Sequence, residues 1–443
     1  MSPRIALRAG ALVVLTALAL TACSTGTGTT SAAPAAACAP TGGNVNLTFT
    51  SWLPGIDKAV KIWNDKNPDI QVAVQTGPNG NGGTYKNFFN QIQAGNAPDL
   101  GQIEYDALPN FRVQDGVVNI ADCAGVSDAK SQFVDWTWNQ VSFGETNAVY
   151  AVPQDIGPEA LYYRADLFEA AGIPIPTTWA EYAADAEKIR ALGGYITNFS
   201  QSDINAFAGL VWQNGGQWFN NNGTDWTVTM DSAKSDEVAT YWQGLLSKDL
   251  VAKLPPWTDE WNAAYDKGTM WTWVSAVWGA NTISSGAPST AGKWAVAPMP
   301  QWNAGEKAAG NWGGSSTAVL KGSKHPYEAA KFALWLNTDA EALTAMNQSA
   351  NIYPATTAGQ KLPAFTEGLP FYGGQKIYDV FAAAAAEVNP DFTWGPTMTQ
   401  TYTDVADGFS SALSGGSTLS DALKSGQDKT IAAMKAQSIP VKG

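Results

Sequence analysis

The chain has 443 residues, with 26 basic and 39 acidic side chains and a formal net charge of −13 at pH 7. This charge repels nucleic acid and anionic lipid head groups, and no basic run offsets it, so a nucleic-acid-binding role is excluded. A length of roughly 400 residues beyond the N-terminal segment exceeds the size at which one hydrophobic core keeps growing, so two lobes are expected.

The aromatic content is the strongest departure from average composition. There are 19 tryptophans, whereas His325 is the only histidine of the sequence. Because histidine is the commonest general base and metal ligand, this contrast argues against catalysis based on histidine. The three cysteines show no CxxC or Cys/His cluster, so we expect no metal and no cofactor.

The first 23 residues have the pattern of an export signal. Arg4 and Arg8 precede an apolar run at 11–20, which is too short to span a bilayer. Two small residues then precede Cys23, as in bacterial lipoproteins whose signal is cut before a cysteine that becomes lipid-modified. We therefore expect residues 1–23 to be a lipoprotein signal and Cys23 to hold the protein on the extracellular face of the cell membrane. The alternative is an ordinary signal peptide with an incidental cysteine.

A linker is expected after the anchor. Residues 24–43 are almost entirely Ser, Thr, Gly, Ala and Pro, which predicts a flexible segment, and folded sequence is expected from Asn44. With Cys23 lipidated, Cys38 and Cys123 remain as an even pair in an oxidising compartment. They form either one disulfide that joins the linker to the first lobe or two free thiols.

Strand and helix patterns alternate in the first part of the chain. Strands are predicted at 45–50, 70–75, 99–103 and 148–153, and helices at 56–67 and 85–94. Such alternation is typical of a parallel sheet with helices on both faces, in which ligands bind beyond the carboxyl ends of the strands. Trp52 and the segment 104–106 lie at two such ends.

Helices dominate the second part. The residues 154–158 indicate a crossing between lobes, and Thr177 or Thr178 is expected to cap a helix that ends at Ala191. Further elements are a hairpin at 220–223, strands at 294–300 and 317–320, and helices at 325–336, 374–387, 397–414 and 419–437.

The chain resembles the family-1 extracellular solute-binding proteins, the sugar-binding lipoproteins of ABC importers. The segments that carry the resemblance are Ser51-Trp52, Ala94–Asp99 (AGNAPD), Tyr150–Pro153, Leu161–Phe168 with the following EAAGIPIPTTW, and Lys331–Leu336. The resemblance implies an α/β, two-lobed, periplasmic-binding-protein-like fold with hinge crossovers and a ligand cleft between the lobes. It implies lobe 1 from residues 44–153 plus 301–340, and lobe 2 from residues 154–300 plus 341–443.

The candidate ligand-binding residues combine aromatic faces with polar groups. Indole rings stack on the apolar C–H faces of a sugar, and carboxylates and amides bind its hydroxyls. The predicted set is Trp52, Glu104, Asp106, Gln154, Asp155, Trp212, Trp278, Trp312, Gly313 and Trp394. Within it, the resemblance supplies Trp212, Trp278 and Trp394 as stacking residues. The pairs Trp136 with Trp138 and Trp257 with Trp261 are expected to pack in the core or at the surface.

We expect a non-catalytic, monomeric receptor that closes on a di- to tetrasaccharide such as xylobiose or cellobiose. The implied partners are this oligosaccharide, the transmembrane permease subunits of an ABC transporter, and the membrane through the lipid anchor. Two alternatives stay open. A secreted glycoside hydrolase would need two carboxylates ~5 Å or ~6.5–9.5 Å apart, which Glu104 and Asp106 could supply. A binding protein for another solute, such as a quaternary amine, could use an aromatic cage.

Overall fold

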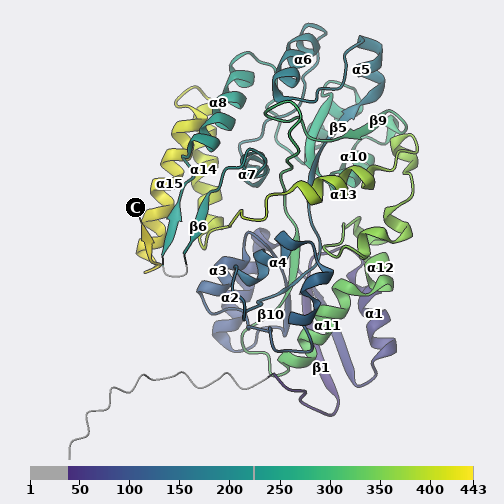
Figure 1. The fold of residues 1–443 in the computed structure, drawn as a ribbon, viewed down its shortest axis with the longest axis vertical. Helices are drawn as coiled ribbons and strands as arrows, with labels where there is room; N and C mark the ends of the chain where they lie inside the picture. The colour runs from purple at the N-terminus through teal and green to yellow at the C-terminus, as the bar shows by residue number, and fades with distance from the viewer. Residues whose placement is uncertain (1–37, 223–224, 443) are drawn as a thin grey trace, which may run out of the picture. The chain divides into compact units, whose positions relative to one another are not determined.

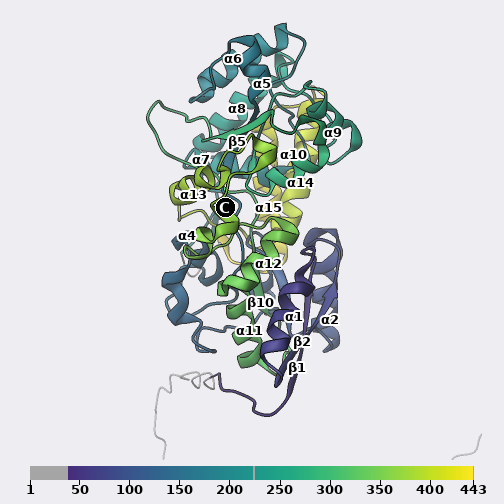
Figure 2. The same cartoon turned by 90° about the vertical axis from the view of Figure 1, so that its right-hand side faces the viewer.

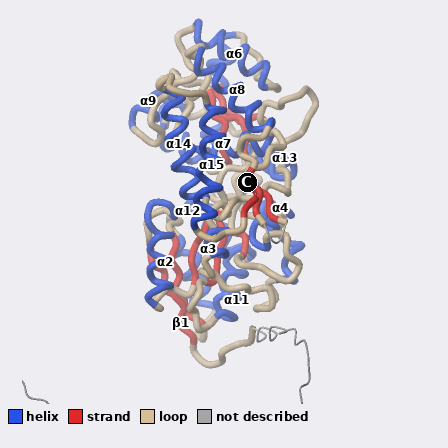
Figure 3. Tube along the Cα trace, turned by 90° about the vertical axis from the view of Figure 1, so that its left-hand side faces the viewer, coloured by secondary structure: helices blue, strands red, loops and turns tan. Residues whose placement is uncertain are grey.

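The structure is a computed structural model that describes residues 38–222 and 225–442. The expected signal peptide, the lipidation at Cys23 and the linker up to residue 37 lie outside the described residues. From Cys38 onward the chain forms one compact unit of α-helices and short strands, shown in Figures 1 and 3.

The first sheet has five strands in the order β2-β1-β3-β10-β4. They are β1 (Val45–Ser51), β2 (Ile70–Thr76), β3 (Leu100–Glu104), β4 (Val152–Pro153) and β10 (Ser315–Val319). β1 is parallel to β2 and to β3, but β10 is antiparallel to β3 and to β4. The sheet is therefore mixed rather than wholly parallel as expected, because β10 returns from a distant part of the chain and enters in the opposite direction.

Six helices accompany this sheet, and together they form the first lobe. They are α1 (Ile56–Lys66), α2 (Tyr85–Ala94), α3 (Leu108–Val113), α4 (Asp135–Ser142), α11 (Pro326–Thr338) and α12 (Ala340–Ala350). In α1 the buried residues Ile56, Ala59, Val60 and Trp63 recur at helical spacing, which gives the helix one apolar face. Trp63 packs edge-on against Phe332 of α11, with ring centroids 5.4 Å apart.

The position of α12 differs from the expected lobe boundary at residue 340. This helix packs against α1 and α11, and Figure 2 shows the three helices side by side. Glu341 at its start forms an ion pair with Lys66 at 2.9 Å, and Ser349 near its end accepts a hydrogen bond from Lys58 at 3.4 Å. Residues 341–350 therefore lie with the first lobe rather than with the second.

The second lobe contains two three-stranded sheets, in the orders β8-β5-β9 and β11-β7-β6. Their strands are β5 (Glu159–Arg164), β8 (Thr272–Ala276), β9 (Trp294–Ala297), β6 (Phe219–Asn221), β7 (Trp226–Val228) and β11 (Val441–Lys442). β5 is antiparallel to both of its neighbours, and β6 and β7 form an antiparallel pair where the sequence predicted a hairpin.

Nine of the described α-helices belong to this lobe. They are α5 (Ala165–Ala171), α6 (Trp179–Ala191), α7 (Ile204–Gln213), α8 (Ala233–Ser247), α9 (Asp259–Asp266), α10 (Gly279–Gly286), α13 (Ile377–Glu387), α14 (Met398–Leu413) and α15 (Leu419–Ala436). Short helical turns are η1 (Gly80–Thr84), η2 (Ser127–Gln132), η3 (Pro288–Thr290), η4 (Gly359–Lys361), η5 (Pro363–Phe365) and η6 (Pro370–Tyr372). Of the two threonines expected to cap α6, Thr178 does so, in a capping box with Glu181.

Three segments join the lobes, because residues 154–158 lie between the antiparallel segments 311–315 and 352–356. Ser315 O accepts a hydrogen bond from Gln154 N–H at 2.9 Å, and Gly157 O accepts one from Trp312 N–H at 2.8 Å. A side chain on Gly157 would overlap the Trp312 carbonyl, so this close approach requires glycine. Residues 154–158 are thus a crossing, as the sequence indicated, and they lie against the segment that leads into β10.

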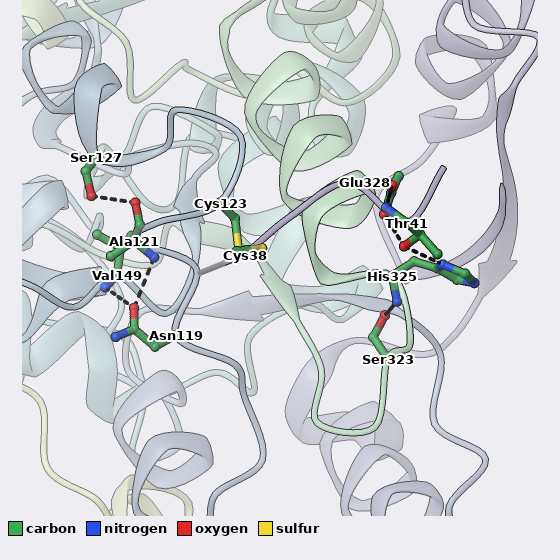
Figure 4. Close-up of a disulfide and its surroundings, with 10 residues drawn as sticks. All are labelled: Cys38, Thr41, Asn119, Ala121, Cys123, Ser127, Val149, Ser323, His325 and Glu328. Atoms are coloured by element: carbon green, nitrogen blue, oxygen red, sulfur yellow. Dashed lines mark hydrogen bonds between the residues drawn. A yellow bond between two sulfur atoms is a disulfide. The ribbon is translucent and has the colours of Figure 1, made fainter. Parts of the chain in front are cut away.

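The N-terminal end of the described chain is fixed to the first lobe. Figure 4 shows the disulfide between Cys38 and Cys123, which are 85 residues apart. Thr41 donates from its backbone N–H and its hydroxyl to the Glu328 carboxylate, at 2.6 and 3.0 Å. The Thr41 hydroxyl also lies 3.1 Å from His325 Nδ1. Tertiary contacts therefore begin before Asn44, inside the segment expected to be linker.

Candidate functional site

A cavity of about 210 Å³ lies where the two lobes meet. Six of the ten predicted ligand-binding residues line it: Trp52, Glu104, Asp155, Trp278, Trp312 and Gly313. The other lining residues are Leu53, Gln102, Ile156, Asn205, Val277, Gly314, Ser315, Ala350, Ile352 and Tyr353. The cavity thus combines strand ends of the first lobe, the crossing segments and two segments of the second lobe.

Gln102 on β3 organises the first-lobe wall. Its Oε1 accepts hydrogen bonds from Ser51 Oγ at 2.7 Å and from Trp52 N–H at 3.3 Å. Its Nε2 donates to Ser315 Oγ at 3.0 Å. These bonds tie the ends of β1, β3 and β10 together, so the half-buried Trp52 has a fixed backbone at the cavity edge. Gln102 is not among the predicted ligand-binding residues, although its place in the third strand, two residues before Glu104, was a usable signal.

Glu104 presents a carboxyl group to the cavity. Its Oε2 accepts a hydrogen bond from the Tyr85 hydroxyl at 2.9 Å, and the same hydroxyl accepts one from Glu104 N–H at 2.9 Å. Loss of hydration, together with the negative charge of Asp106, raises the pKa of Glu104 to about 8. A carboxyl group in this state can donate a hydrogen bond as well as accept one.

Asp155 provides a second carboxyl group, from the crossing segment. Its Oδ1 accepts a hydrogen bond from Ser315 N–H at 2.9 Å, and its backbone carbonyl accepts one from the Tyr105 hydroxyl at 3.1 Å. Burial raises the pKa of Asp155 to about 7. The adjacent Gln154 is fully buried, and its Oε1 accepts a hydrogen bond from Thr317 at 3.3 Å, so its side chain lies behind the cavity wall.

Tryptophans from the second lobe and the re-entry segment form the opposite wall. The rings of Trp278 and Trp312 meet edge-on with centroids 4.7 Å apart, and Trp278 Nε1 donates to the Trp312 carbonyl at 3.1 Å. The next two residues, Gly313 and Gly314, have φ angles of 79° and 95°, a conformation that favours glycine. These two glycines make a turn between Trp312 and the start of β10, and this turn places Trp312 beside Trp278.

Trp257, which was expected to pack in the core or at the surface, packs against the rings of this aromatic wall but does not line the cavity. Its ring centroid lies 5.9 Å from Trp278 and 6.4 Å from Trp312, yet 51% of the residue is exposed. Its φ of 66° is in the left-handed region, which is uncommon for a tryptophan and marks strain of the kind found at functional sites. The preceding Pro255-Pro256 was the one signal in the sequence that this residue sits in a constrained turn.

Three predicted residues lie in a second cluster, outside the cavity. Trp212 and Trp394 are only 1% and 3% exposed, and their rings meet at 6.2 Å. Trp394 also approaches Tyr402, whose hydroxyl donates to Asp106 Oδ2 at 2.7 Å. Trp212 is stacked on Phe392. The structure therefore does not bring these residues together with Trp52 and Trp278, and a ligand role for them stays a prediction.

The raised pKa values predict how stability depends on pH. Between the ordinary values near 4 and the folded-state values of about 7 and 8, the folded protein holds protons on Asp155 and Glu104 that the unfolded chain releases. Unfolding then releases protons, so the stability of the ligand-free protein is expected to fall as pH rises through this window. The midpoint temperature of thermal unfolding (Tm) at pH 5, 6.5 and 8 measures this fall in stability.

Glu104→Gln should flatten this fall in Tm, whereas Glu169→Gln, at an exposed position on α5, should leave it unchanged. An equal fall in Tm in the wild type and in both variants would show that Glu104 does not carry the effect.

Other site chemistries find no support in the described part of the chain. No group of three or more His, Cys, Asp or Glu side chains there could hold a metal ion. None of the described helices is both long and apolar enough to cross a membrane. The cavity between the lobes has aromatic rings on one side and hydrogen-bonding carboxyl and amide groups on the other. This combination suits a ring bearing several hydroxyls.

Comparison with known families gives a match over most of the chain. A family model described as bacterial extracellular solute-binding protein matches residues 46–343. Among similar proteins, the arabinooligosaccharide-binding protein of Halalkalibacterium halodurans is 25% identical over 346 residues, covering 75% of this chain and 76% of that protein. The lactose-binding protein of Rhizobium radiobacter is 29% identical over 291 residues, covering 63% of this chain and 67% of that protein.

Two solved structures are similar over nearly the whole fold. One is the galacto-N-biose-/lacto-N-biose I-binding protein of an ABC transporter from Bifidobacterium longum, in complex with lacto-N-biose, with a TM-score of 0.81 and 28% identity over 90% of this chain and 100% of that chain. The other is an ABC-transporter-associated binding protein from B. animalis subsp. lactis in complex with beta-1,6-galactobiose, with a TM-score of 0.77 and 30% identity over the same shares.

Proposed function

The chain belongs to the bacterial extracellular solute-binding proteins, and from this membership we propose that it captures an oligosaccharide between its lobes and delivers it to the permease of an ABC importer. It is a binding protein rather than an enzyme, its fold is the two-lobed α/β fold expected from the sequence, and its place is outside the cytoplasm.

The single observation that best supports a sugar ligand is the pairing of Trp278 and Trp312 with Glu104 and Asp155 around one cavity. Indole faces and carboxyl groups are complementary to the two kinds of surface that a pyranose presents. The names of the relatives, which include arabinooligosaccharide-, lactose- and lacto-N-biose-binding proteins, agree with this ligand class. Trp52 and Gly313 complete the proposed contact set.

A di- to tetrasaccharide is the proposed ligand, and its size bears on how the lobes work. The cavity of about 210 Å³ is smaller than the ~300–1,000 Å³ of pockets that enclose a whole drug-sized ligand. Binding therefore requires the lobes to be further apart than here, or part of the ligand to lie outside. Because the ligand would contact both lobes only when they are close, binding would shift the population toward closure.

The contacts that such an opening would break are the ones that bury the second cluster. The Tyr402–Asp106 hydrogen bond joins α14 of one lobe to the end of β3 in the other. Thr399 on α14 likewise donates to Asn81 at 3.1 Å. Separation here would uncover Asp106, Trp212 and Trp394, which is how these three residues would come to contact a longer ligand, whereas Gln154 would stay bonded to Thr317 of β10.

We also propose the organisation that surrounds this domain. Residues 1–23 would be a lipoprotein signal that is cut just before Cys23. Cys23 would then carry the lipid that holds a monomeric receptor at the membrane. Lobe 1 would comprise residues 44–153 and the segment from β10 through α12, and lobe 2 the rest of the described chain, including residues 301–309, which pair with Thr178 and Val388. The supporting facts are the lipobox-like sequence and the division of the strands between the five-stranded sheet of lobe 1 and the two three-stranded sheets of lobe 2.

Calorimetry and tryptophan fluorescence with a glycan panel test the proposal. The panel contains xylobiose, cellobiose, lactose, beta-1,6-galactobiose and arabinobiose, with the matching trisaccharides. We expect one binding site and a change of tryptophan emission, because Trp52, Trp278 and Trp312 line the cavity. Absence of heat and of emission change with every member would contradict the proposal, and release of reducing ends from any of them would favour a hydrolase instead.

A further inference from the structure

A second, smaller cavity of about 70 Å³ lies beside the first, entirely within the second lobe except for Trp312. Trp312 lines both cavities, and the segment 203–206 contributes Asn205 to one and Asp203 and Ala206 to the other. The remaining lining residues are Glu159, Thr197, Asn198, Phe199, Ser200, Phe207, Leu210, Trp242, Trp261, Trp273 and Val274. The two cavities are therefore neighbours that share a wall.

Glu159 is the unusual member of this set. It is the first residue of β5, only 1% of it is exposed, and its Oε2 is buried with no hydrogen-bond partner. The surrounding backbone makes room for the carboxyl group, since a side chain on Gly209 or Gly310 would overlap Oε2. A buried carboxyl oxygen without a hydrogen-bond partner is unfavourable, and burial raises the pKa of Glu159 well above its usual range, so a cationic donor nearby would stabilise its ionised form.

Asp203 places a second carboxyl group in the same cavity. Burial raises its pKa to about 6, and hydrogen bonds from Ser200 and Trp257 act in the opposite direction. Glu104 and Asp155 line the adjoining cavity, yet among the described residues that line the two cavities there is no lysine, arginine or histidine. The two carboxyl groups of the smaller cavity thus have no basic side chain among the lining residues to compensate them.

The walls of the second cavity are aromatic. The rings of Trp261 and Trp273 meet edge-on at 5.1 Å, and those of Trp273 and Trp312 at 6.0 Å. Indole faces attract cations through their negative quadrupole, and this attraction strengthens where water is excluded. The space accommodates a few water-sized groups but not a pyranose ring, so it can take one substituent of a ring held in the larger cavity.

We propose that this cavity, defined by Glu159, Asp203 and the rings of Trp261, Trp273 and Trp312, receives the protonated amine of an amino sugar, so that the oligosaccharide captured by this protein contains a 2-amino-2-deoxyhexose. The inference rests on the proposed function and deepens it by naming the substrate class. An ammonium group supplies three N–H donors and a positive charge, whereas a hydroxyl supplies one donor and no charge. The former therefore offers the carboxyl groups that line this cavity both more donors and an opposite charge.

The test compares each neutral disaccharide with its amino counterpart by calorimetry at neutral pH. The pairs are cellobiose with the glucosamine disaccharide of the same linkage, and lactose and beta-1,6-galactobiose with analogues whose terminal hexose is the 2-amino-2-deoxy sugar. The preferred amino disaccharide is expected to bind at least about tenfold more tightly than its neutral partner. In Glu159→Gln, which keeps size and shape, this ratio of Kd values should fall to near one.

One control variant and one further test variant accompany this comparison. Glu328→Gln removes another buried carboxylate, on α11 of the first lobe, and should leave the ratio unchanged. Asp203→Asn serves as a second variant if Glu159→Gln fails to fold, and it too should lower the ratio. Neutral sugars that bind as well as or better than their amino counterparts would overturn this inference and leave the proposed function standing. If no saccharide of either kind binds, the proposed function itself fails.

Discussion

Replacing Trp278 by alanine is expected to weaken oligosaccharide binding by about 100-fold, equivalent to roughly 3 kcal/mol, the scale of a central aromatic contact. The half-buried ring lines the cavity, and its Nε1 hydrogen bond to the Trp312 carbonyl holds the neighbouring ring in place. The substitution removes a stacking face and leaves that carbonyl without its indole donor. Calorimetry with the tightest-binding glycan of the panel measures the loss, and thermal unfolding shows whether the variant is folded.

Two phenylalanine variants separate the contributions. Trp278→Phe keeps an apolar ring but not the N–H group, so an intermediate loss of affinity is expected. Trp335→Phe makes the same change on α11, where the side chain packs against Trp63 of the first lobe, and should leave the Kd unchanged. Wild-type affinity in a folded Trp278→Ala protein would place the ligand elsewhere and remove the main support for this site.

Removing the disulfide is expected to destabilise the first lobe by about 4 kcal/mol. The bond closes a loop of 85 residues that contains β1, β2 and β3, so its loss restores a large conformational freedom to the unfolded chain. In the double variant Cys38→Ser/Cys123→Ser the unfolding transition of this lobe should shift down by roughly 10 °C. The double variant avoids leaving a free thiol, and differential scanning calorimetry resolves the transition.

Ligand affinity should be unaffected by the same change. Cys38 and Cys123 do not line the cavity, and the contacts of Thr41 with Glu328 are independent of the sulfur atoms. Reduction of the wild-type protein should reproduce the lower transition temperature. An unchanged transition in both samples would mean that the Cys38–Cys123 bond does not constrain the unfolded chain.

The local elements follow closely from sequence patterns. The strand and helix predicted at 70–75 and 85–94 correspond to β2 (Ile70–Thr76) and α2 (Tyr85–Ala94). These predictions succeed because side-chain periodicity, and the residues that begin or end a helix or strand, are local features of the sequence. The direction of β10 could not be predicted in the same way, because it depends on hydrogen bonds with β3 that no local pattern specifies.

The residues of the candidate site could likewise be predicted only where local sequence patterns indicated them. Strand ends and the crossing segment indicated Trp52, Glu104 and Asp155, and the structure places all three around one cavity. Tryptophan identity did not distinguish Trp212, which is buried against Phe392, from Trp257, which is half exposed beside Trp278 and Trp312. The two differ in their neighbours, and those come from distant parts of the chain.

The sequence by itself determines the two-lobed α/β class, the membership of the solute-binding family and the positions of most helices and strands. Each of these is encoded in short-range periodicity or in motifs of consecutive residues. Only the tertiary structure decides which indole rings face the cavity, that α12 belongs with the first lobe, and that Glu159 is buried without a partner. Burial and hydrogen-bond satisfaction are properties of contacts between residues far apart in sequence, and such contacts exist only once the chain has folded.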